Sequence, residues 1–387
     1  MNPPTMRRRC WPATAVWTIA AVAAVLAAGA ASTAAAAAPA EEPAVAPAYE
    51  DDLDWQVAAP PRAGWLFVLP VIGYAPETGF VFGASAAYQR HVGGARSSTA
   101  LPVALLTSKQ QLMLSLLADA WLDRDRWHLL AVLAYRNFPT LFYGIGDRTA
   151  AASEERFTDR SAALQVELTR RCLGSLYAGV ALEASRTRLR EIAPGGLLEA
   201  GAVPGAGGGE LRGAGAVVAW DTRDAVQYPT RGWFNRLVVT RFIDALGGGY
   251  QFTATEASLA RYLPLGGGSV LAIGAQGSFQ NGGDVPFYRL NRLGLRGYFE
   301  ERHRDRHAVR AQIELRSQLW RRLGAVLFVG GGELAAAVDR LRLDETSPMA
   351  GGGLRFNVGG EQRANLALDI GFGDGDQGVY VSFAEAF

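Results

Sequence analysis

The sequence predicts an all-β protein: a transmembrane antiparallel β-barrel of about 16 strands, with a long sixth surface loop folded into its lumen. Three observations lead to this prediction. Strand-length segments alternate between apolar residues and Gln, Glu, Arg or Ser, which suits a wall with lipid on one side and a wet lumen on the other. Connections alternate between short and long, as periplasmic turns and surface loops do. The chain also ends in an aromatic-rich, strand-like segment, residues 378–387.

A soluble β-sandwich is the main alternative, because its strands alternate as well. In a sandwich the apolar faces would meet in a shared core. Here the faces that must meet inside carry Gln, Glu, Arg and Ser, which is inverted for a soluble core and favours the membrane barrel.

Composition and charge exclude several classes of protein. The 387 residues are 49% hydrophobic and 19% charged, enough for one large domain or two ordinary ones. The formal net charge is +1, so no basic field points to a nucleic-acid partner. Of the two cysteines, Cys10 lies in the N-terminal segment and Cys172 stands alone, which leaves neither an intramolecular disulfide nor a cysteine metal site.

The N-terminal segment has the features of a secretory signal. Three arginines at positions 7–9 precede an apolar stretch, residues 13–31, and a run of alanines at positions 34–38. We expect residues 1–38 to be a signal peptide; the alternative is an uncleaved membrane anchor, since the apolar run approaches spanning length. Residues 39–63, rich in Pro, Ala, Glu and Asp, are expected to be a disordered lead-in. Residues 64–387 are then expected to form the barrel, in the bacterial outer membrane.

The strands follow one another along the rest of the chain. Alternation is sharpest in residues 162–169, where leucine and valine alternate with Gln165, Glu167 and Thr169. Glycine and proline mark the intervening turns. About 16 strands are predicted: residues 66–74, 81–88, 99–107, 111–122, 127–135, 162–169, 176–185, 211–220, 233–242, 250–262, 270–279, 306–320, 325–338, 352–358, 365–372 and 378–387.

The connection after the eleventh strand is long for a hairpin, at about residues 280–304. Loops of this length are usually functional or disordered. The strand after it places Gln312, Glu314 and Arg316 on its polar face. We therefore predict that this loop folds back into the lumen and that Arg296, near its middle, anchors it there.

Four stretches together resemble a known family. They are Leu295-Arg296-Gly297-Tyr298; Asp221-Thr222-Arg223-Asp224 with the following Tyr228-Pro229-Thr230-Arg231-Gly232-Trp233; Phe142-Tyr143-Gly144-Ile145-Gly146; and Val379-Tyr380-Val381-Ser382-Phe383. In this order they resemble the BamA/TamA superfamily of outer-membrane assembly and transport barrels, the bacterial surface antigen family. The similarity covers residues 64–387. With the N-terminus inside, the loop containing Arg296 falls on the outer surface, where that family places its sixth loop.

The resemblance implies that Arg296 pairs with acids on the inner wall. Asp369 is the first candidate, because its apolar neighbours Leu368 and Ile370 share the outward face. Glu333 is the second, with apolar neighbours on both sides. The alternative is a surface Arg-Gly turn with no partner.

A polar turn is expected between the eighth and ninth strands. Its own charges and a proline order it, and its role is structural rather than catalytic. The residues concerned are Asp221, Arg223, Asp224, Pro229 and Gly232.

The function implied by the resemblance is insertion or translocation of protein or lipid at the outer membrane. It would use a weak first-to-last strand seam marked by Ile72, Tyr380 and Phe387, with outer-membrane lipid as partner and unfolded outer-membrane proteins or lipids as clients. Only about 25 residues separate the signal from the first strand, so we expect no periplasmic transport-associated domains, which handle clients in typical members. The alternatives are a passive porin-like channel and a structural surface antigen.

No enzyme activity, cofactor or metal is expected. The sequence contains neither a Gly-x-Ser-x-Gly elbow nor a phosphate-binding loop. Among its four histidines, His303 and His307 are interleaved with arginines, which disfavour a metal. His128, near a strand start, could in principle serve a hydrolase, which would need a serine and an acid close by.

Overall fold

The computed structural model describes residues 64–75, 78–90, 96–147, 149–150, 153–299, 301–357, 365–383, 385 and 387. They belong to one compact unit, Ala63–Phe387. The expected signal peptide and lead-in lie outside the described residues. Among those described, none of the helices has the length and apolar character needed to cross a membrane.

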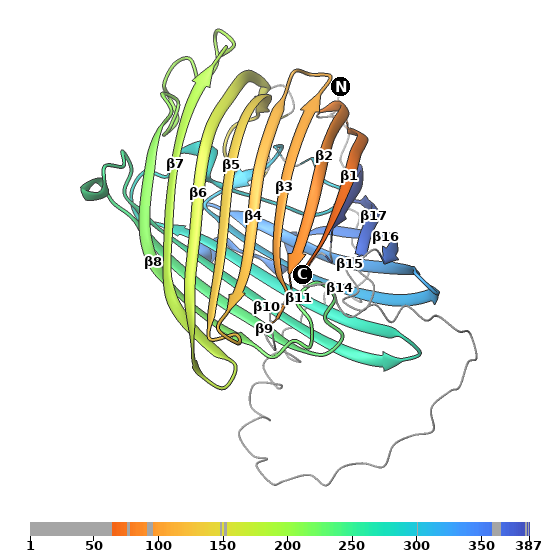
Figure 1. Cartoon of the computed structure of the whole chain (residues 1–387). Coiled ribbons are helices and arrows are strands. Elements are labelled where there is room, and N and C mark those ends of the chain that lie inside the picture. The colour runs from red at the N-terminus through yellow and green to blue at the C-terminus, as the bar shows by residue number, and fades with distance from the viewer. Residues whose placement is uncertain are drawn as a thin grey trace, which may run out of the picture. The chain divides into compact units, whose positions relative to one another are not determined.

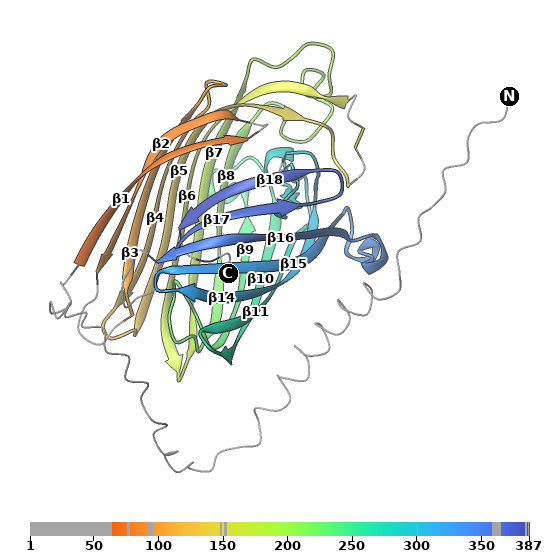
Figure 2. The ribbon, with the colours of Figure 1, turned by 90° about the vertical axis from the view of Figure 1, so that its right-hand side faces the viewer.

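Sixteen strands form one antiparallel sheet in which nearly every strand pairs with its neighbours in the chain, which confirms the predicted strand number. The sheet curls into a barrel wall (Figures 1 and 2). Its strands are β1 (Gly64–Ala75), β2 (Gly79–Arg90), β3 (Ser98–Thr107), β4 (Leu112–Leu122), β5 (Trp127–Phe142), β6 (Glu155–Leu173), β7 (Leu176–Arg190), β8 (Gly209–Asp221), β9 (Gly232–Phe242), β10 (Phe252–Gly266), β11 (Ser269–Asn281), β14 (His307–Trp320), β15 (Leu323–Ala335), β16 (Ser347–Asn357), β17 (Asn365–Phe372) and β18 (Gln377–Phe383).

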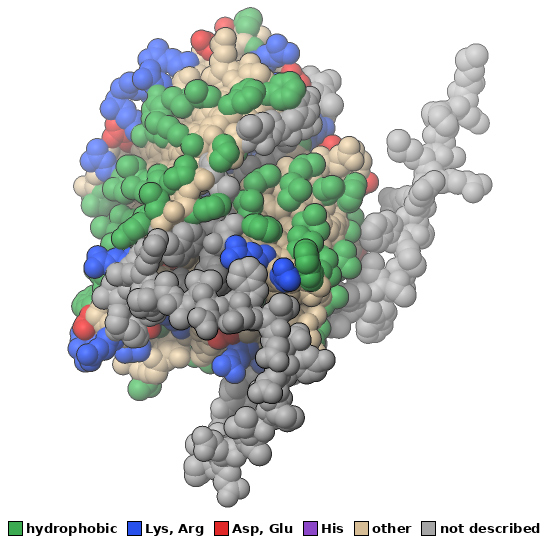
Figure 3. Space-filling view, turned by 45° about the vertical axis from the view of Figure 1, so that its right-hand side comes forward, with side chains coloured by type: hydrophobic (Ala, Val, Ile, Leu, Met, Phe, Trp, Pro, Cys, Tyr) green, Lys and Arg blue, Asp and Glu red, His purple; other side chains and the backbone are tan. Residues whose placement is uncertain are grey.

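Alternation along each strand separates a lipid-facing side from a lumen-facing side. On β6, Leu164 and Leu168 are exposed on the outer face, while Glu167 between them points inward and pairs with Arg236 of β9. Hydrophobic side chains cover much of the outer wall seen in Figure 3, with most basic side chains above and below them. The side-chain period of two along a strand produces this separation.

The two rims of the barrel differ in the length of their connections. One rim carries two-residue turns at residues 174–175, 267–268 and 321–322. The other carries longer segments, including residues 191–208 and 282–306. Short turns mark the periplasmic rim of outer-membrane barrels and long loops the surface rim.

Apolar side chains fill the lumen near the surface rim. Phe287, in the short helix η3 (Phe287–Arg289) of the long loop, packs edge-on against Phe142 of β5 and Phe157 of β6. Leu198 from the loop after β7 joins the same cluster. Both loops therefore fold inward at this end.

The sheet has two end strands, β1 and β18, and their Cα atoms come within 8 Å of each other. The last strand ends at Phe383, earlier than predicted. Phe387 leaves the sheet, and its ring stacks against Tyr262 of β10 inside the barrel, with 6.3 Å between ring centroids. The prediction that Phe387 marks the seam is therefore wrong, because the end of the chain turns into the lumen.

Candidate functional site

The loop between β11 and β14 carries the predicted anchor motif. A two-residue ladder, β12 (Asn291–Arg292) with β13 (Arg304–Asp305), closes its neck. Residues 293–299 extend from this neck into the lumen, where Leu293 and Leu295 pack with Val326 and Phe328 of β15. We call residues 293–299 the loop tip.

Arg296 lies at the centre of the loop tip and makes four contacts with the wall. Its guanidinium donates to Asp369 of β17 at 2.8 Å and to Glu314 of β14 at 2.5 Å. It donates to Gln312 at 3.2 Å and lies over the Phe328 ring, 3.4 Å from the centroid. The side chain of Arg296 is 13% exposed and that of Glu314 is fully buried, so water screens this pairing little.

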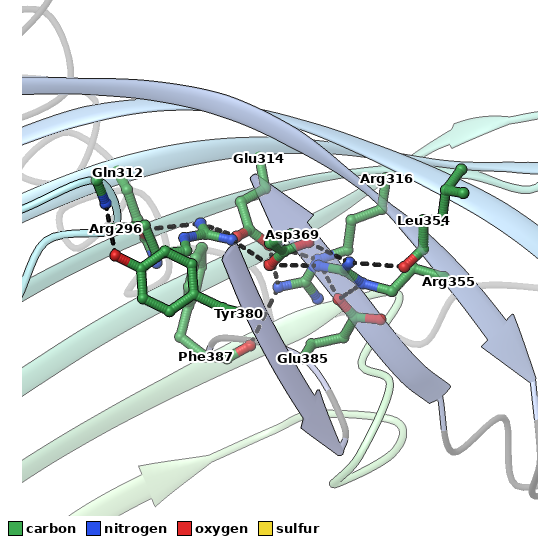
Figure 4. Close-up of polar contacts among 11 residues, drawn as sticks. Arg296, Gln312, Glu314, Arg316, Leu354, Arg355, Asp369, Tyr380, Glu385 and Phe387 are labelled. Atoms are coloured by element: carbon green, nitrogen blue, oxygen red, sulfur yellow. Dashed lines mark hydrogen bonds and ion pairs between the residues drawn. The ribbon is translucent and has the colours of Figure 1, made fainter. Parts of the chain in front are cut away.

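These contacts are part of a closed ring of six charged groups (Figure 4). Asp369 also accepts from Arg355 of β16 at 2.5 Å, and Arg355 pairs with Glu385 at 2.9 Å. Glu385 lies 3.7 Å from Arg316 of β14, which pairs with Glu314 at 2.9 Å. Three arginines and three carboxylates alternate around this ion-pair ring, so every buried charge in it has two opposite neighbours.

The ion-pair ring joins parts of the chain that are far apart in sequence. It links the loop tip, the wall strands β14, β16 and β17, and the C-terminal residues. Arg316 also donates to the main-chain carbonyl of Phe387 at 3.2 Å, and Asn365 donates to Glu385 at 2.8 Å. The loop tip and the end of the chain are therefore held by one set of charges.

Glycines allow the loop tip to approach the wall closely. Gly297 adopts a φ of +99°, a left-handed conformation that favours glycine. Its N–H donates to the hydroxyl of Tyr380 on β18 at 2.8 Å. A Cβ atom on Gly371 of β17 would lie 2.8 Å from the Arg296 carbonyl carbon, too close for any side chain. Tyr298 donates to the Pro348 carbonyl at 2.6 Å and completes the contact.

Glu333, the second predicted partner of Arg296, is not among its contacts. The register of β15 with β14 pairs Glu333 with Val309, on the face opposite to that of Glu314 and Phe328. Its carboxylate accepts instead from the backbone N–H of Arg342 at 2.6 Å. The prediction was wrong because apolar residues on both sides of Glu333 did not reveal its direction.

Four members of the ion-pair ring were not predicted: Glu314, Arg316, Arg355 and Glu385. The polar face of residues 306–320 already placed Glu314 and Arg316 in the lumen, so the alternation could have identified them. Glu385 carried no such signal, because it lies beyond the end of β18.

A second charged cluster holds the neck of the loop. Glu301 pairs with Arg292 at 3.0 Å and with Arg304 at 2.7 Å. Burial would raise the pKa of the Glu301 carboxyl, but Arg292 and Arg304 together hold it below its ordinary value of 4.5. Burial lowers the pKa of the Arg304 guanidinium to about 10. The cluster therefore needs an ionised Glu301.

The third motif of the family resemblance meets this neck. Gly146 donates through its N–H to the Arg304 carbonyl at 2.8 Å, in an isolated bridge. Tyr143 packs edge-on against Phe299, with ring centroids 6.2 Å apart. The loop after β5 thus braces the surface end of the long loop.

The predicted polar turn lies at the short-turn rim, far from the loop tip in sequence. Asp221 accepts from Arg223 at 2.8 Å and from Arg96, beside β3, at 2.5 Å. Asp224 accepts from the N–H of Thr230 at 2.8 Å and closes the turn on itself. Pro229 is buried within it, and Gly232 follows with a φ of +106°. Arg96 was not among the predicted residues of the turn, and its bond to Asp221 joins the turn to the start of β3.

The side-chain contacts of His128 are with an acid and an aromatic ring of the neighbouring strand β4. It pairs with Asp119 at 3.0 Å and stacks on Trp121 at 4.0 Å between ring centroids. Over the described residues, no group of three or more His, Cys, Asp or Glu side chains has the arrangement of a metal site.

Known proteins share this barrel architecture. A family model described as the Omp85 superfamily domain matches residues 92–384. Among solved structures, BamA from Haemophilus ducreyi lacking POTRA domains 1-3 superposes with a TM-score of 0.53 at 14% identity, covering 83% of this chain and 70% of that chain. No curated protein matches the sequence.

Two further structures are similar. CdiB from Acinetobacter baumannii has a TM-score of 0.53 at 11% identity and covers 83% of this chain and 59% of its own. CdiB from Escherichia coli has a TM-score of 0.54 at 12% identity and covers 83% of this chain and 62% of its own. This chain thus spans less than two thirds of either CdiB chain, and likeness at these identities concerns the fold alone.

Proposed function

The chain belongs to the Omp85 superfamily, and on this premise we propose that it assists the insertion or translocation of protein or lipid at the outer membrane. One observation carries the proposal. The loop tip is fastened to the last strands of the sheet, through Asp369 on β17 and Tyr380 on β18. Because β18 is an end strand of the sheet, the seat of the loop tip and the β1–β18 boundary are physically linked.

The proposed mechanism uses this boundary as a lateral opening. A strand edge freed from its partner presents unpaired N–H and C=O groups, which a client segment can pair with. While the loop tip is seated, the ion-pair ring holds β14, β16 and β17 in register next to that edge. Release of the tip would loosen the last strands without unfolding the rest of the barrel.

The test measures assembly in liposomes. The purified barrel is placed in proteoliposomes, and the folding of a small unfolded outer-membrane protein is timed with and without it. We expect acceleration that disappears when the boundary is crosslinked. Unchanged folding kinetics in the presence of the open barrel would refute an assembly role.

The crosslink requires careful placement. Replacing Tyr380, one of the residues predicted to mark the seam, with cysteine would also remove the acceptor for the Gly297 N–H. Val381, exposed on the outer face of β18, avoids this. A cysteine at position 381 is paired with a second cysteine at either Leu66 or Val68 of β1. Both double variants also carry Cys172→Ser, because the exposed Cys172 could form unwanted disulfides. The same variant under reducing conditions is the control.

A passive channel is the second candidate, favoured by a polar cavity of about 440 Å³ beside the loop tip. Glu256, Gln276 and Arg310 are among its lining residues. A channel predicts steady ion conductance that persists after the boundary is crosslinked, together with no effect on client folding.

A further inference from the structure

Five exposed arginines gather on the outer face of the wall near the surface rim. We call them the arginine patch: Arg160 of β6, Arg186, Arg188 and Arg190 of β7, and Arg212 of β8. The register pairs Arg160 with Arg188, and it pairs Leu164 with Ala184 on the same face. Leu164 and Leu182 are 44% and 54% exposed on this face, so the patch continues the lipid-facing belt rather than the lumen.

The position of the arginine patch along the strands matches a membrane interface. At the short-turn rim, Arg170 of β6 lies over the ring of Trp127, 5.5 Å from its centroid, as in an interfacial aromatic girdle. Arg160 is ten residues further along β6. A strand rising about 3.3 Å per residue at a tilt of about 40° covers roughly 25 Å over that length, the height of the apolar band of such barrels. Arg160 therefore lies at the opposite, outer interface.

The arginine patch has more positive charge than its own surroundings neutralise. Glu210 pairs with Arg186 at 3.3 Å and with Arg212 at 3.0 Å. Arg160 donates to the hydroxyl of Tyr135 at 3.2 Å, which leaves its charge in place. No carboxylate of the described residues forms an ion pair with Arg160, Arg188 or Arg190.

A hollow lies beside two members of the patch, Arg160 and Arg190. Arg160 and Arg190 line a cavity of about 500 Å³ together with Asn137, Pro139 and Thr158. Glu191 also lines it, and its carboxylate accepts from the Thr158 hydroxyl at 2.7 Å. The hollow offers two guanidinium groups and the amides of Gln110 and Asn137 to a polar head group, against the single carboxylate of Glu191.

We propose that the arginine patch binds the phosphate groups of a phosphorylated glycolipid in the outer leaflet. Guanidinium groups bind phosphate oxygens in a bidentate geometry. The patch directly borders the lipid-facing leucines, so a ligand with acyl chains can cover Leu164 and Leu182 while its phosphate meets Arg160 and Arg188. A protein partner would gain no such continuity with the apolar belt. This site is separate from the loop tip and does not depend on the proposed assembly function.

The first experiment titrates the intact barrel, in neutral detergent, with bisphosphorylated lipid A and counts bound lipid by native mass spectrometry. We expect binding that is at least tenfold tighter than that of the same lipid with both phosphates removed. Inorganic phosphate at equal concentration should leave the bound fraction unchanged, since it lacks the acyl chains. Equal binding of the dephosphorylated lipid would overturn the proposal, and so would full competition by inorganic phosphate.

The second experiment locates the site. The variant R160Q/R188Q/R190Q should bind bisphosphorylated lipid A at least tenfold more weakly. The matched control R170Q/R261Q/R321Q removes three arginines from the short-turn rim and should bind within twofold of the native barrel. Heat-dependent gel mobility reports folding of each variant, and R160K/R188K/R190K, which keeps the charge, should retain more binding than the glutamine variant. Native affinity in the first variant, or equal losses in both glutamine variants, would disprove the assignment.

Discussion

Glu385, two residues before the end of the chain, lies 2.9 Å from the guanidinium of Arg355 on β16. Arg355 also holds Asp369, which in turn holds Arg296 of the loop tip. The end of the chain and the loop tip are therefore linked through Arg355 and Asp369. Removing one charge from such a buried network leaves each of its neighbours with one partner instead of two, whereas removing a complete pair costs less.

Arg296→Ala should destabilise the seat of the loop tip by at most about 3–5 kcal/mol, because Glu314 and Asp369 would each lose one of two arginine partners in a poorly screened site. The measurement is the temperature at which the barrel loses its heat-dependent gel mobility, together with proteolysis of residues 282–306. Glu333→Gln is the control and should leave both unchanged. An identical melting profile for Arg296→Ala would show that the ion-pair ring does not hold the loop.

Glu385→Gln should loosen the end of the chain while leaving the strands paired, since both Arg316 and Arg355 would lose a charged partner. We expect carboxypeptidase to remove Phe387 faster than in the native barrel. Asp374→Asn, on the exposed connection before β18, is the matched control. Equal rates for Glu385→Gln and the native barrel would show that the ion pairs of Glu385 do not hold the end of the chain.

Gly371→Ala should displace the loop tip by steric conflict, because its Cβ would lie 2.8 Å from the Arg296 backbone. Overpacking of this kind costs about 1–3 kcal/mol. Gly207→Ala is the control, since a Cβ there meets nothing within 4 Å. Urea unfolding in detergent compares the two variants, and a larger loss for Gly207→Ala would count against the close approach.

The neck of the loop should weaken in acid. Arg292 and Arg304 hold the pKa of Glu301 below 4.5, so the folded state favours the ionised carboxylate. A lowered folded-state pKa contributes stability that is complete above about pH 4.5 and is lost as the pH falls through the folded-state value. Proteolysis of residues 282–306 by an acid-active protease should therefore rise below pH 4.5. Glu301→Gln should already be sensitive at pH 7 and should show a flatter pH dependence.

Alternation along the chain was enough to predict the strands and most of their faces. The side-chain period of two forces Gln312, Glu314 and Arg316 to one side of a strand, and any fold that keeps the apolar side in lipid puts them in the lumen. The glycine next to Arg296 likewise indicated a tight loop tip. These are local properties, readable from neighbouring residues alone.

The choice of partners required the folded wall. Glu333 and Glu314 are both acids on strands near the loop, but the register of β15 on β14 puts Glu333 on the face opposite to that of Glu314, which contacts Arg296. Phe387 is an aromatic residue of the kind expected at a strand end. It lies outside the sheet, where its ring stacks on Tyr262 and its carbonyl accepts a hydrogen bond from Arg316. Pairings between distant residues, such as Arg296 with Asp369 or Arg316 with Phe387, depend on strand register and loop path, which no local pattern records.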